Sequence, residues 1–152
     1  MIQLDEHAEV VLYFSLFIIM RLSRIIVGEV RGVEALDMMQ AMNTGHDGSL
    51  STGHANSAQD MISRLETLVL TAKDFPLQAI RRQIASALDI IVHLGRLRDR
   101  TRRVIEISEI LYSDGDIILN PLFTYEDGED KGSLVKTENT MKNIGKLKRM
   151  GL

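Results

Sequence analysis

The sequence contains no cysteine, which excludes disulfide bonds and thiolate metal sites and is compatible with a cytosolic chain. It also lacks an excess of positive charge, because its formal net charge is −3 and its pI is about 5.8. Domains that coat nucleic acid usually carry an obvious basic excess, so no nucleic acid is expected as a partner. Any anion that this chain binds must be held by a local site.

The sequence also lacks an apolar run long enough to cross a membrane. The main candidate, VVLYFSLFIIM at residues 10–20, has eleven residues, whereas a bilayer core requires about 20 apolar residues in a helix. A secretory signal is not expected, because a basic leader and a small-residue cleavage site are both missing. Residues 10–20 favour a buried strand or a core helix, and the absence of a clear period leaves both alternatives open.

The overall composition is that of one soluble globular domain, with 152 residues, 45% hydrophobic and 26% charged. The β-branched run at residues 25–27 ends at Gly28 and Glu29, and GVEALDMMQAM then repeats apolar residues every three or four positions. This change of period predicts a buried strand followed at once by a helix that ends near residues 43–45. A strand followed by a helix suggests a βα unit.

A short strand and two further helices are predicted next. The strand is expected around Leu50, between glycines. Asn56 or Ser57 can cap a helix through AQDMISRLETLVLTA, and Pro76 suits the start of a third helix. The apolar stripe of that third helix is formed by Ile80, Ile84 and Leu88.

From Asp89 the pattern changes to strands joined by turns. DIIVHLGRLRD and TRRVIEISEILYS flank a polar turn at residues 99–101, and SDGD at residues 113–116 predicts a second turn into IILNPLFTYE. In the middle strand, alternation places Ser108 and Glu109 on the polar side. Residues 127–152 are poor in large apolar side chains and are expected to form a disordered tail.

Glu29 lies where the apolar run of the first strand would otherwise continue. In open α/β sheets, ligands bind outside the carboxyl ends of the strands. A carboxylate in that position can orient or deprotonate a water for attack on a phosphoryl group, or help to hold Mg²⁺. The alternative is that Glu29 pairs with Arg31 or caps the following helix, and the residues alone leave both readings open.

The glycine-rich segment TGHDGSLSTGHAN carries His46, Asp47 and His54. Their spacing matches no standard set of metal ligands, so no metal site is expected from these side chains. A histidine at a strand end can donate to a terminal phosphate, and the alternative is a histidine that bonds to a neighbouring backbone carbonyl. No lysine follows these glycines, so the segment is not a Walker A loop.

Two groups of arginines are expected to face solvent. Arg81 and Arg82 flank the stripe of the third helix, and the alternative for them is an arginine that reaches a neighbouring subunit's phosphate. The second group crowds the end of the first C-terminal hairpin and is expected either to be solvated or to form a patch for an anionic partner. It comprises Arg96, Arg98, Arg100, Arg102 and Arg103.

The order of these segments resembles the type II/type IV secretion ATPase family, and specifically its CpaF-like branch, which serves tight-adherence (Flp-type) pilus assembly. The resemblance covers roughly residues 24–125 and is carried by RIIVGEVRG with GHDGS…HAN, followed by PLQAIRRQIASALDIIVHLGRLRDRTRRVIEISEI. It implies that these first two motifs are the Walker B region and the His box. It further implies that Glu29 polarises the attacking water and His54 senses the γ-phosphate, with Arg31 and His46 near the nucleotide.

The resemblance also implies a fold, ligands and partners. The fold would be α/β, part of a RecA-like P-loop NTPase core with a mostly parallel sheet, helices on both faces and a C-terminal antiparallel hairpin region. ATP and Mg²⁺ would be the ligands. Other ATPase subunits in a homo-hexamer and inner-membrane secretion or pilus platform proteins would be the partners, at a cytoplasmic location peripheral to the inner membrane.

The sequence departs from the family pattern in several places. No G-x-x-x-x-G-K-[ST] loop or acidic box occurs, Gly53 stands where relatives usually carry a bulkier apolar residue, and residues 1–23 form an atypical N-terminal segment. Residues 24–126 are therefore expected to be the C-terminal part of the ATPase domain, from a truncated chain or a fragment. Such a chain should be inactive alone, because the loop that holds the phosphates is missing.

Two expectations follow from that missing part. The sheet should expose an edge or use residues 10–20 to cover it. The alternative function is a non-catalytic remnant that acts as an assembly or interaction module.

Overall fold

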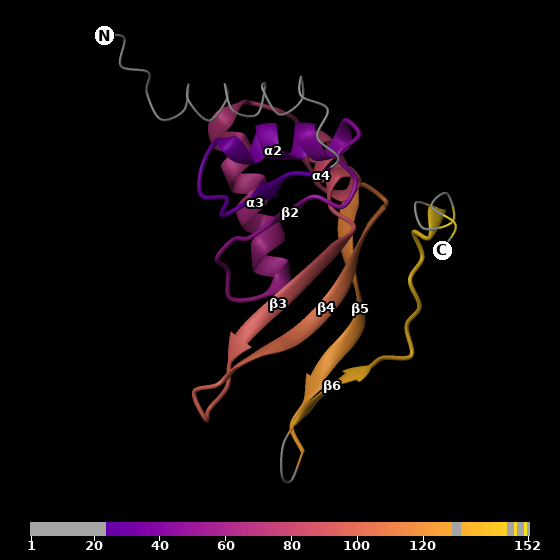
Figure 1. Ribbon diagram of the computed structural model, residues 1–152. Helices are drawn as coiled ribbons and strands as arrows, with labels where there is room; N and C mark the ends of the chain where they lie inside the picture. Colours follow the sequence, from indigo (N-terminus) through magenta and orange to yellow (C-terminus); the bar gives the residue numbers. More distant parts are fainter. Residues whose placement is uncertain (1–23, 129–131, 146–147, 149–150, 152) are drawn as a thin grey trace.

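The computed structural model describes residues 24–128, 132–145, 148 and 151. Over these residues the chain is a mixed α/β fold, with the helices gathered at one end of a long antiparallel sheet (Figure 1). The strand or helix predicted at residues 10–20 lies outside the described part. Within that part, the structure contains no helix with the length and apolar content needed to cross a membrane.

The described elements follow the predicted order of strand, helix, strand, two helices and then strands. In chain order they are β1 (Ile26–Val27), α2 (Glu34–Asn43), β2 (Leu50–Ser51), α3 (Ala58–Ala72), α4 (Leu77–Ala87), β3 (Ile90–Arg96), β4 (Arg102–Ser113), β5 (Asp116–Glu126) and β6 (Ser133–Lys136). The βα unit, the short strand at Leu50 and the change to strands after residue 89 are therefore confirmed. The burial predicted for the first strand is wrong, because Ile26 is exposed and Val27 is only half-buried.

Glu34, Ser57 and Pro76 lie at or just before the starts of the three described helices. Before α2, one carboxylate oxygen of Glu34 accepts hydrogen bonds from the backbone N–H of Arg31 at 2.6 Å and of Gly32 at 2.9 Å. Glu34 thus binds two N–H groups of the loop just before α2, whereas the residue at the cap position, Val33, makes no side-chain cap hydrogen bond. Ser57 caps α3 by accepting from the Asp60 N–H at 3.0 Å, and Pro76 directly precedes α4.

The prediction of a mostly parallel sheet is wrong for the described residues. Parallel pairing is confined to β1 and β2, where Ile26 lies opposite Leu50 and Val27 opposite Ser51. The other four strands form an antiparallel sheet in the order β3-β4-β5-β6, as predicted for the C-terminal region. Tight turns impose this arrangement, because a parallel pair requires a crossover of about a dozen residues or more.

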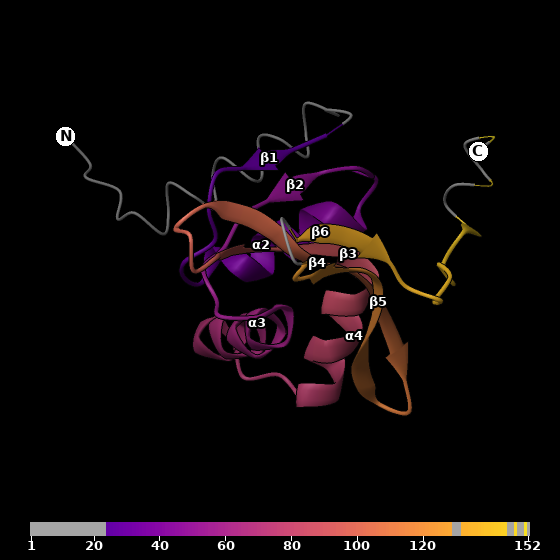
Figure 2. The same ribbon diagram turned by 90° about the horizontal axis from the view of Figure 1, so that it is seen from below.

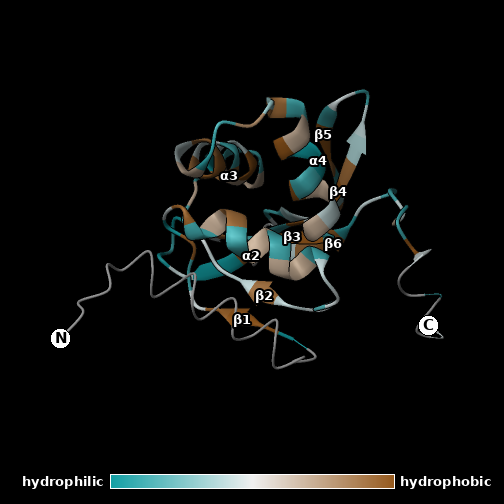
Figure 3. Ribbon diagram, turned by 90° about the horizontal axis from the view of Figure 1, so that it is seen from above, coloured by the Kyte–Doolittle hydropathy of each residue, from teal (hydrophilic) through white to brown (hydrophobic). Residues whose placement is uncertain are grey.

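The helices meet in one hydrophobic core. Figures 2 and 3 both show α2 between the β1–β2 pair and α3, with α4 beside β5. Ile80 and Ile84 of α4 are fully buried, and Ile110 of β4 is buried with them. All three described helices contribute to this one core, so the expectation of helices on both faces of a sheet is not met in the described part of the chain.

The polar assignment of Ser108 and Glu109 is also wrong, because both side chains are fully buried. β4 changes register with β5 between Ile107 and Ser108, which interrupts simple alternation. The Glu109 carboxylate accepts hydrogen bonds from the backbone N–H of Asn143 at 2.7 Å and of Lys142 at 2.9 Å. These donors lie 33 and 34 residues further along the chain, where alternation along one strand carries no information.

The segment after Glu126, predicted to be a disordered tail, contains regular structure in its described part. Ser133–Lys136 forms β6 and pairs antiparallel with β5. Beyond it, Asn139 Nδ2 donates to the Pro121 carbonyl at 2.8 Å, and the N–H groups of Lys142 and Asn143 reach Glu109. Polar contacts, rather than large apolar side chains, hold this segment against the sheet.

Replacing the buried carboxylate should weaken the fold in a pH-dependent way. Burial raises the pKa of Glu109, but the N–H groups of Asn143 and Lys142 and the Asn120 amide together hold it below the ordinary value of 4.5. Its stabilising contribution is therefore present above pH 4.5 and is lost as the pH falls. We expect Glu109→Gln to lower the free energy of unfolding at pH 7 by about 2 kcal/mol.

Urea unfolding at pH 7 and at pH values below 4.5 measures both effects. The Gln variant should lose less stability than the parent on acidification. Glu126→Gln, at an exposed position of β5, is the control and should change little at pH 7. Equal stability of the parent and Glu109→Gln at neutral pH would show that the contact of Glu109 with its three donors is energetically unimportant.

Candidate active site

The end of β1 and the segment after β2 are held side by side by backbone hydrogen bonds. The Leu50 N–H donates to the Ile25 carbonyl at 2.9 Å, and the Val30 N–H donates to the Thr52 carbonyl at 2.9 Å. The Thr52 hydroxyl also donates to the Gly28 carbonyl. This pairing continues past the strands, so the residues that follow each strand end come together.

Glu29 and His54 meet at this edge. His54 Nε2 lies 3.2 Å from Glu29 Oε1, and the Arg31 guanidinium forms an ion pair with Glu29 Oε2. The Glu29 side chain is 19% exposed, whereas those of Arg31 and His54 are 74% and 81% exposed. The site is therefore a partly shielded carboxylate flanked by two solvent-accessible nitrogen groups.

The surroundings of Glu29 favour its ionised form. The hydrogen bond from Arg31 is the main cause that holds the pKa of Glu29 below its ordinary value, against a smaller opposing effect of burial. The charges of Arg31, His54 and Arg64 act in the same direction as the hydrogen bond. At neutral pH the group is thus a carboxylate that can accept hydrogen bonds, including one from a water molecule.

The pairing of Glu29 with Arg31 was one of the two readings that the sequence left open, and it is present in the structure. The other local reading, Glu29 as a cap of the following helix, is not found, because the cap position of α2 is Val33 and that helix end has no side-chain cap hydrogen bond. The carboxylate is shared between two partners, because its other oxygen contacts His54.

Arg64 is a site residue that sequence reasoning missed. It lies on α3, and its Nη1 donates to the backbone carbonyl of His54 at 2.8 Å. The two residues are ten positions apart, on a loop and a helix, and no motif at that spacing points to the contact. Arg64 therefore fixes the backbone that carries the His54 side chain.

The packing of Met61 explains why position 53 is a glycine in this chain. A Cβ atom at Gly53 would lie 2.5 Å from Met61 Cε and 2.9 Å from Met61 Sδ. The Met61 side chain thus takes the space next to the loop, and a larger residue at position 53 would require Met61 to move.

His46 lies away from the Glu29 cluster. Its side chain is buried, and its Nδ1 donates to the Ala41 carbonyl at 2.9 Å, since a carbonyl oxygen can only accept. The His46 carbonyl accepts from the Ser49 hydroxyl at 2.7 Å, and that hydroxyl accepts from the Ile25 N–H at 2.8 Å. In this structure His46 matches the carbonyl-bonded alternative and connects α2 to the start of β1.

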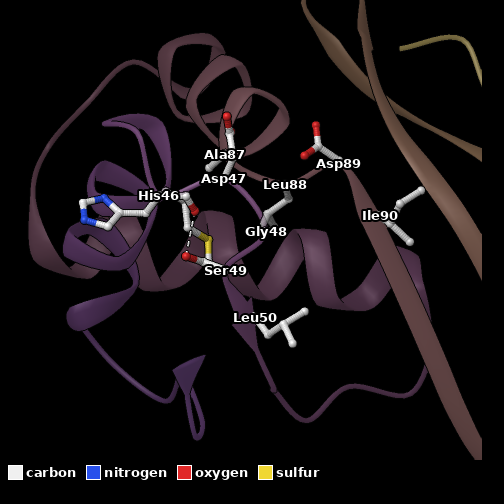
Figure 4. Close-up of a pocket in the computed structure, with 10 residues that line it drawn as sticks. His46, Asp47, Gly48, Ser49, Leu50, Ala87, Leu88, Asp89 and Ile90 are labelled. Atoms are coloured by element: carbon white, nitrogen blue, oxygen red, sulfur yellow. Dashed lines mark hydrogen bonds between the residues drawn. The ribbon is translucent and has the colours of Figure 1, made fainter. Parts of the chain in front are cut away.

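The residues from His46 to Leu50 also line a pocket of about 230 Å³. Its other wall is formed by residues 87–90, at the end of α4 and the start of β3 (Figure 4). Neither Glu29 nor His54 lines it. We assign the candidate site to the Glu29 cluster because that cluster combines an ionised carboxylate with two largely exposed nitrogen groups. The histidine of the pocket wall, His46, is instead buried and bonded to a backbone carbonyl.

The expectation that Arg81 faces solvent is wrong. Its Nε donates to Glu66 at 2.7 Å, its Nη1 lies 3.2 Å from Asp116, and the side chain is 26% exposed. Arg81 therefore connects α3, α4 and β5. Arg82 is exposed, with its guanidinium 5.8 Å from the centre of the Tyr112 ring.

Comparisons with known proteins extend these observations. Residues 1–148 match the family model described as Type II/IV secretion system protein. The conjugal transfer protein TrbB of Rhizobium radiobacter is 42% identical over 91 residues, which are 60% of this chain and 27% of TrbB. The type IV secretion system protein VirB11 of Brucella suis is 35% identical over 97 residues, which are 61% of this chain and 26% of VirB11.

A solved structure shows the same relationship. The crystal structure of the VirB11 ATPase from the Brucella suis type IV secretion system, in complex with sulphate, has a TM-score of 0.61 and 30% sequence identity to this chain. The match covers 65% of this chain and 31% of that structure. This chain thus spans between a quarter and a third of the length of these relatives.

Removing the Arg64 side chain should loosen the loop that carries His54. We expect Arg64→Gln to increase amide hydrogen exchange of residues 53–55 by about fivefold, the effect of losing one hydrogen bond of about 1 kcal/mol. Exchange followed by NMR measures it. Arg82→Gln, on α4 and away from the loop, is the matched control, and an unchanged loop in Arg64→Gln would show that this contact does not hold it.

Proposed function

Because this chain belongs to the type II/IV secretion system protein family, we propose that it supplies one part of the ATP-hydrolysing site of a secretion or pilus-assembly ATPase. In this proposal RIIVGEVRG is the Walker B region, and GHDGS…HAN is the His box. The observation that carries it is the 3.2 Å contact between Glu29 and His54, which come from these two motifs. The two residues are 25 positions apart and meet only because the chain folds this way.

Glu29 is proposed to orient the water that attacks the terminal phosphate. Its carboxylate is ionised, partly shielded from bulk solvent and located beyond a strand end, where an acceptor can fix the direction of a water O–H. While Arg31 stays paired with it, the lowered pKa makes Glu29 a poor base. Movement of Arg31 towards a bound phosphate would therefore make Glu29 a stronger base and at the same time bring a positive charge to the anion.

His54 and Arg31 are the groups proposed to face the phosphate. Both side chains are largely exposed, and both can donate hydrogen bonds. His54 would report the γ-phosphate through its ring N–H, and Arg64 would keep its backbone in position. His46 is proposed to act indirectly, because its buried ring holds the loop before β2.

ATP with Mg²⁺ is the proposed substrate, and the residues of this chain fit only one side of it. The chain offers a carboxylate and exposed donors, but its sequence contains no G-x-x-x-x-G-K-[ST] loop to cradle the phosphates. That loop would come from another segment or chain. A related VirB11 ATPase forms a complex with sulphate, a tetrahedral anion like phosphate, which supports an anion site in this family.

Exposed apolar side chains support the view that more protein packs here. Ile26 is 79% exposed and Leu50 is 64% exposed, and they lie opposite each other on β1 and β2. Figure 3 shows these two strands as hydrophobic elements at the outer edge of the fold. We propose that the rest of a RecA-like domain covers this edge, with the present chain as its C-terminal part.

The assembly is proposed to be a homo-hexamer at the cytoplasmic side of the inner membrane, in contact with secretion or pilus platform proteins. The CpaF-like branch, and with it tight-adherence pilus assembly, is proposed from the resemblance of the quoted motifs. The curated relatives reported above serve conjugal transfer and type IV secretion.

A non-catalytic assembly module is the second candidate. It is favoured by one observation, that Arg31 already neutralises the Glu29 carboxylate in the structure. In that case the ion pair would be structural, and the chain would keep only packing surfaces of the motor.

Nucleotide binding by the isolated chain should be weak under the first proposal. The missing phosphate loop removes the backbone donors and the lysine that supply most of the binding energy for the phosphates. We expect isothermal titration calorimetry with Mg-ATP to detect no binding tighter than about 1 mM. Micromolar affinity would instead show that this chain holds a complete phosphate site of its own.

Adding the missing part should restore turnover that depends on Glu29. We expect a P-loop-bearing portion of a family member, supplied in trans or by fusion, to give ATP hydrolysis measured by phosphate release. Glu29→Gln should then reduce the rate by a factor of about 100 or more, because the amide orients and activates water poorly. Glu138→Gln, at an exposed position, is the control. Restored turnover that survives Glu29→Gln would remove Glu29 from the mechanism and favour the assembly module.

A further inference from the structure

The turn between β3 and β4 carries a dense group of exposed arginines. Residues 96–103 contain five arginines and one aspartate, and every one of these arginines is exposed. Figure 1 shows this turn at the end of the sheet that points away from the helices. We call it the basic tip, formed by Arg96, Arg98, Arg100, Arg102 and Arg103.

The charges of the basic tip are balanced only in part by the described residues, since the charge of Arg103 is among the causes that lower the pKa of Asp99. The one aspartate, Asp99, accepts hydrogen bonds from the Thr101 N–H at 2.9 Å and from the Thr101 hydroxyl at 2.7 Å. The ion pairs of the described part involve Glu29 and Arg81, and none includes an arginine of the tip. Arg96 and Arg102 even lie opposite each other in the β3–β4 register, where like charges repel.

The rest of the chain is acidic. The formal net charge of the whole sequence is −3, although the basic tip alone carries a strong positive excess. The molecule therefore has a charge asymmetry that would turn the tip towards an anionic surface and keep the remainder away from it.

An exposed apolar row leads into the tip. On β3, alternate side chains point to the same side, and Val92 is 46% exposed while Leu94 is 65% exposed. Arg96 continues this row into the basic tip. Arginines next to exposed leucine and valine are suited to a lipid headgroup region, where cations meet phosphates and apolar side chains enter the acyl boundary.

We propose that the basic tip docks on anionic phospholipid headgroups. Nucleic acid fits less well, because residues 89–104 contain no phenylalanine, tyrosine or tryptophan to stack on bases, and the surface is a protruding turn rather than a groove. This inference gives the proposed peripheral location a defined contact surface. It needs no ATP hydrolysis, so its failure and the failure of the proposed ATPase function are distinguishable.

The backbone at Arg100 provides a variant that should not harm folding. Arg100 has φ of +68°, a left-handed conformation in which glycine is less strained than arginine. Arg100→Gly removes one charge from the tip and relieves this strain. A loss of lipid binding in that variant cannot be attributed to misfolding.

The test is co-sedimentation of the full chain with unilamellar vesicles. Vesicles of phosphatidylcholine alone are compared with vesicles that contain about one-third phosphatidylglycerol, a composition with a negative surface potential. We expect binding to the anionic vesicles only, and weaker binding at high salt, where charges are screened. Addition of inorganic phosphate at matched ionic strength should release little protein, since a single free anion does not present a surface.

The variants assign the contact to the tip. Each arginine near an anionic surface should change the partition coefficient about fivefold, so Arg100→Gly should weaken binding about fivefold and the combined Arg98→Gln, Arg100→Gly and Arg102→Gln variant on the order of a hundredfold. Leu94→Ser should weaken it further. The matched control removes three exposed cations elsewhere, Lys136, Lys142 and Lys148, and should bind nearly as well as the parent.

The proposal would be overturned by equal binding to neutral and anionic vesicles, by no binding to either, or by equal losses in the tip and lysine variants. Tighter binding of a duplex DNA oligonucleotide than of anionic vesicles would also overturn it. Release of the protein by inorganic phosphate would point to a small-anion site and would also contradict a lipid surface.

Discussion

The hydrogen bond from the Val30 N–H to the Thr52 carbonyl, at 2.9 Å, is the contact on which the candidate site depends. The formal strands β1 and β2 are only two residues long. This hydrogen bond and the Thr52 hydroxyl contact to Gly28 extend their pairing to the residues that carry chemistry. Without that extension, Glu29 and His54 would leave their strands in unrelated directions.

The same part of the fold explains why glycines lie next to Glu29 and His54. Gly28 follows β1 in open space, and Gly53 brings the second segment against Met61. A buried apolar layer below them, with Ile25 and Val30 in the common core, anchors the two segments from beneath. The charged side chains therefore project from a buried apolar base, with Arg31 and His54 largely exposed and Glu29 partly shielded.

Sequence reasoning was most successful where the information is local. Helical periodicity around Ile80 and Ile84, the cap at Ser57 and the turn at residues 113–116 all depend on residues close in the chain, and the structure has these features. The contacts of Arg64 and Arg81 join different elements, and the burial of Glu109 depends on donors from a distant segment. Such partners cannot be read from spacing, because the fold decides which surfaces meet.

The pairing of the strands was predicted less well than the helices were. The expected fold combined a mostly parallel sheet with a C-terminal antiparallel hairpin region, and the turn signals after residue 96 predicted the antiparallel hairpins that the structure has. The solved relative extends over more protein than this chain spans, since the match covers 31% of that structure. The physical chemistry of the turns was the better guide to the strands that are present.

The Glu109 carboxylate of β4 determines how far along the chain the folded unit must extend. Glu109 is surrounded by N–H donors, and three of the contacts come from the backbone of Lys142 and Asn143. A shortened chain that stops before these residues would leave an ionised carboxylate buried in the sheet without most of its hydrogen-bond donors. A shortened chain that keeps this fold must therefore extend to Lys142 and Asn143, which bind Glu109, and cannot end with β6, the last strand of the sheet.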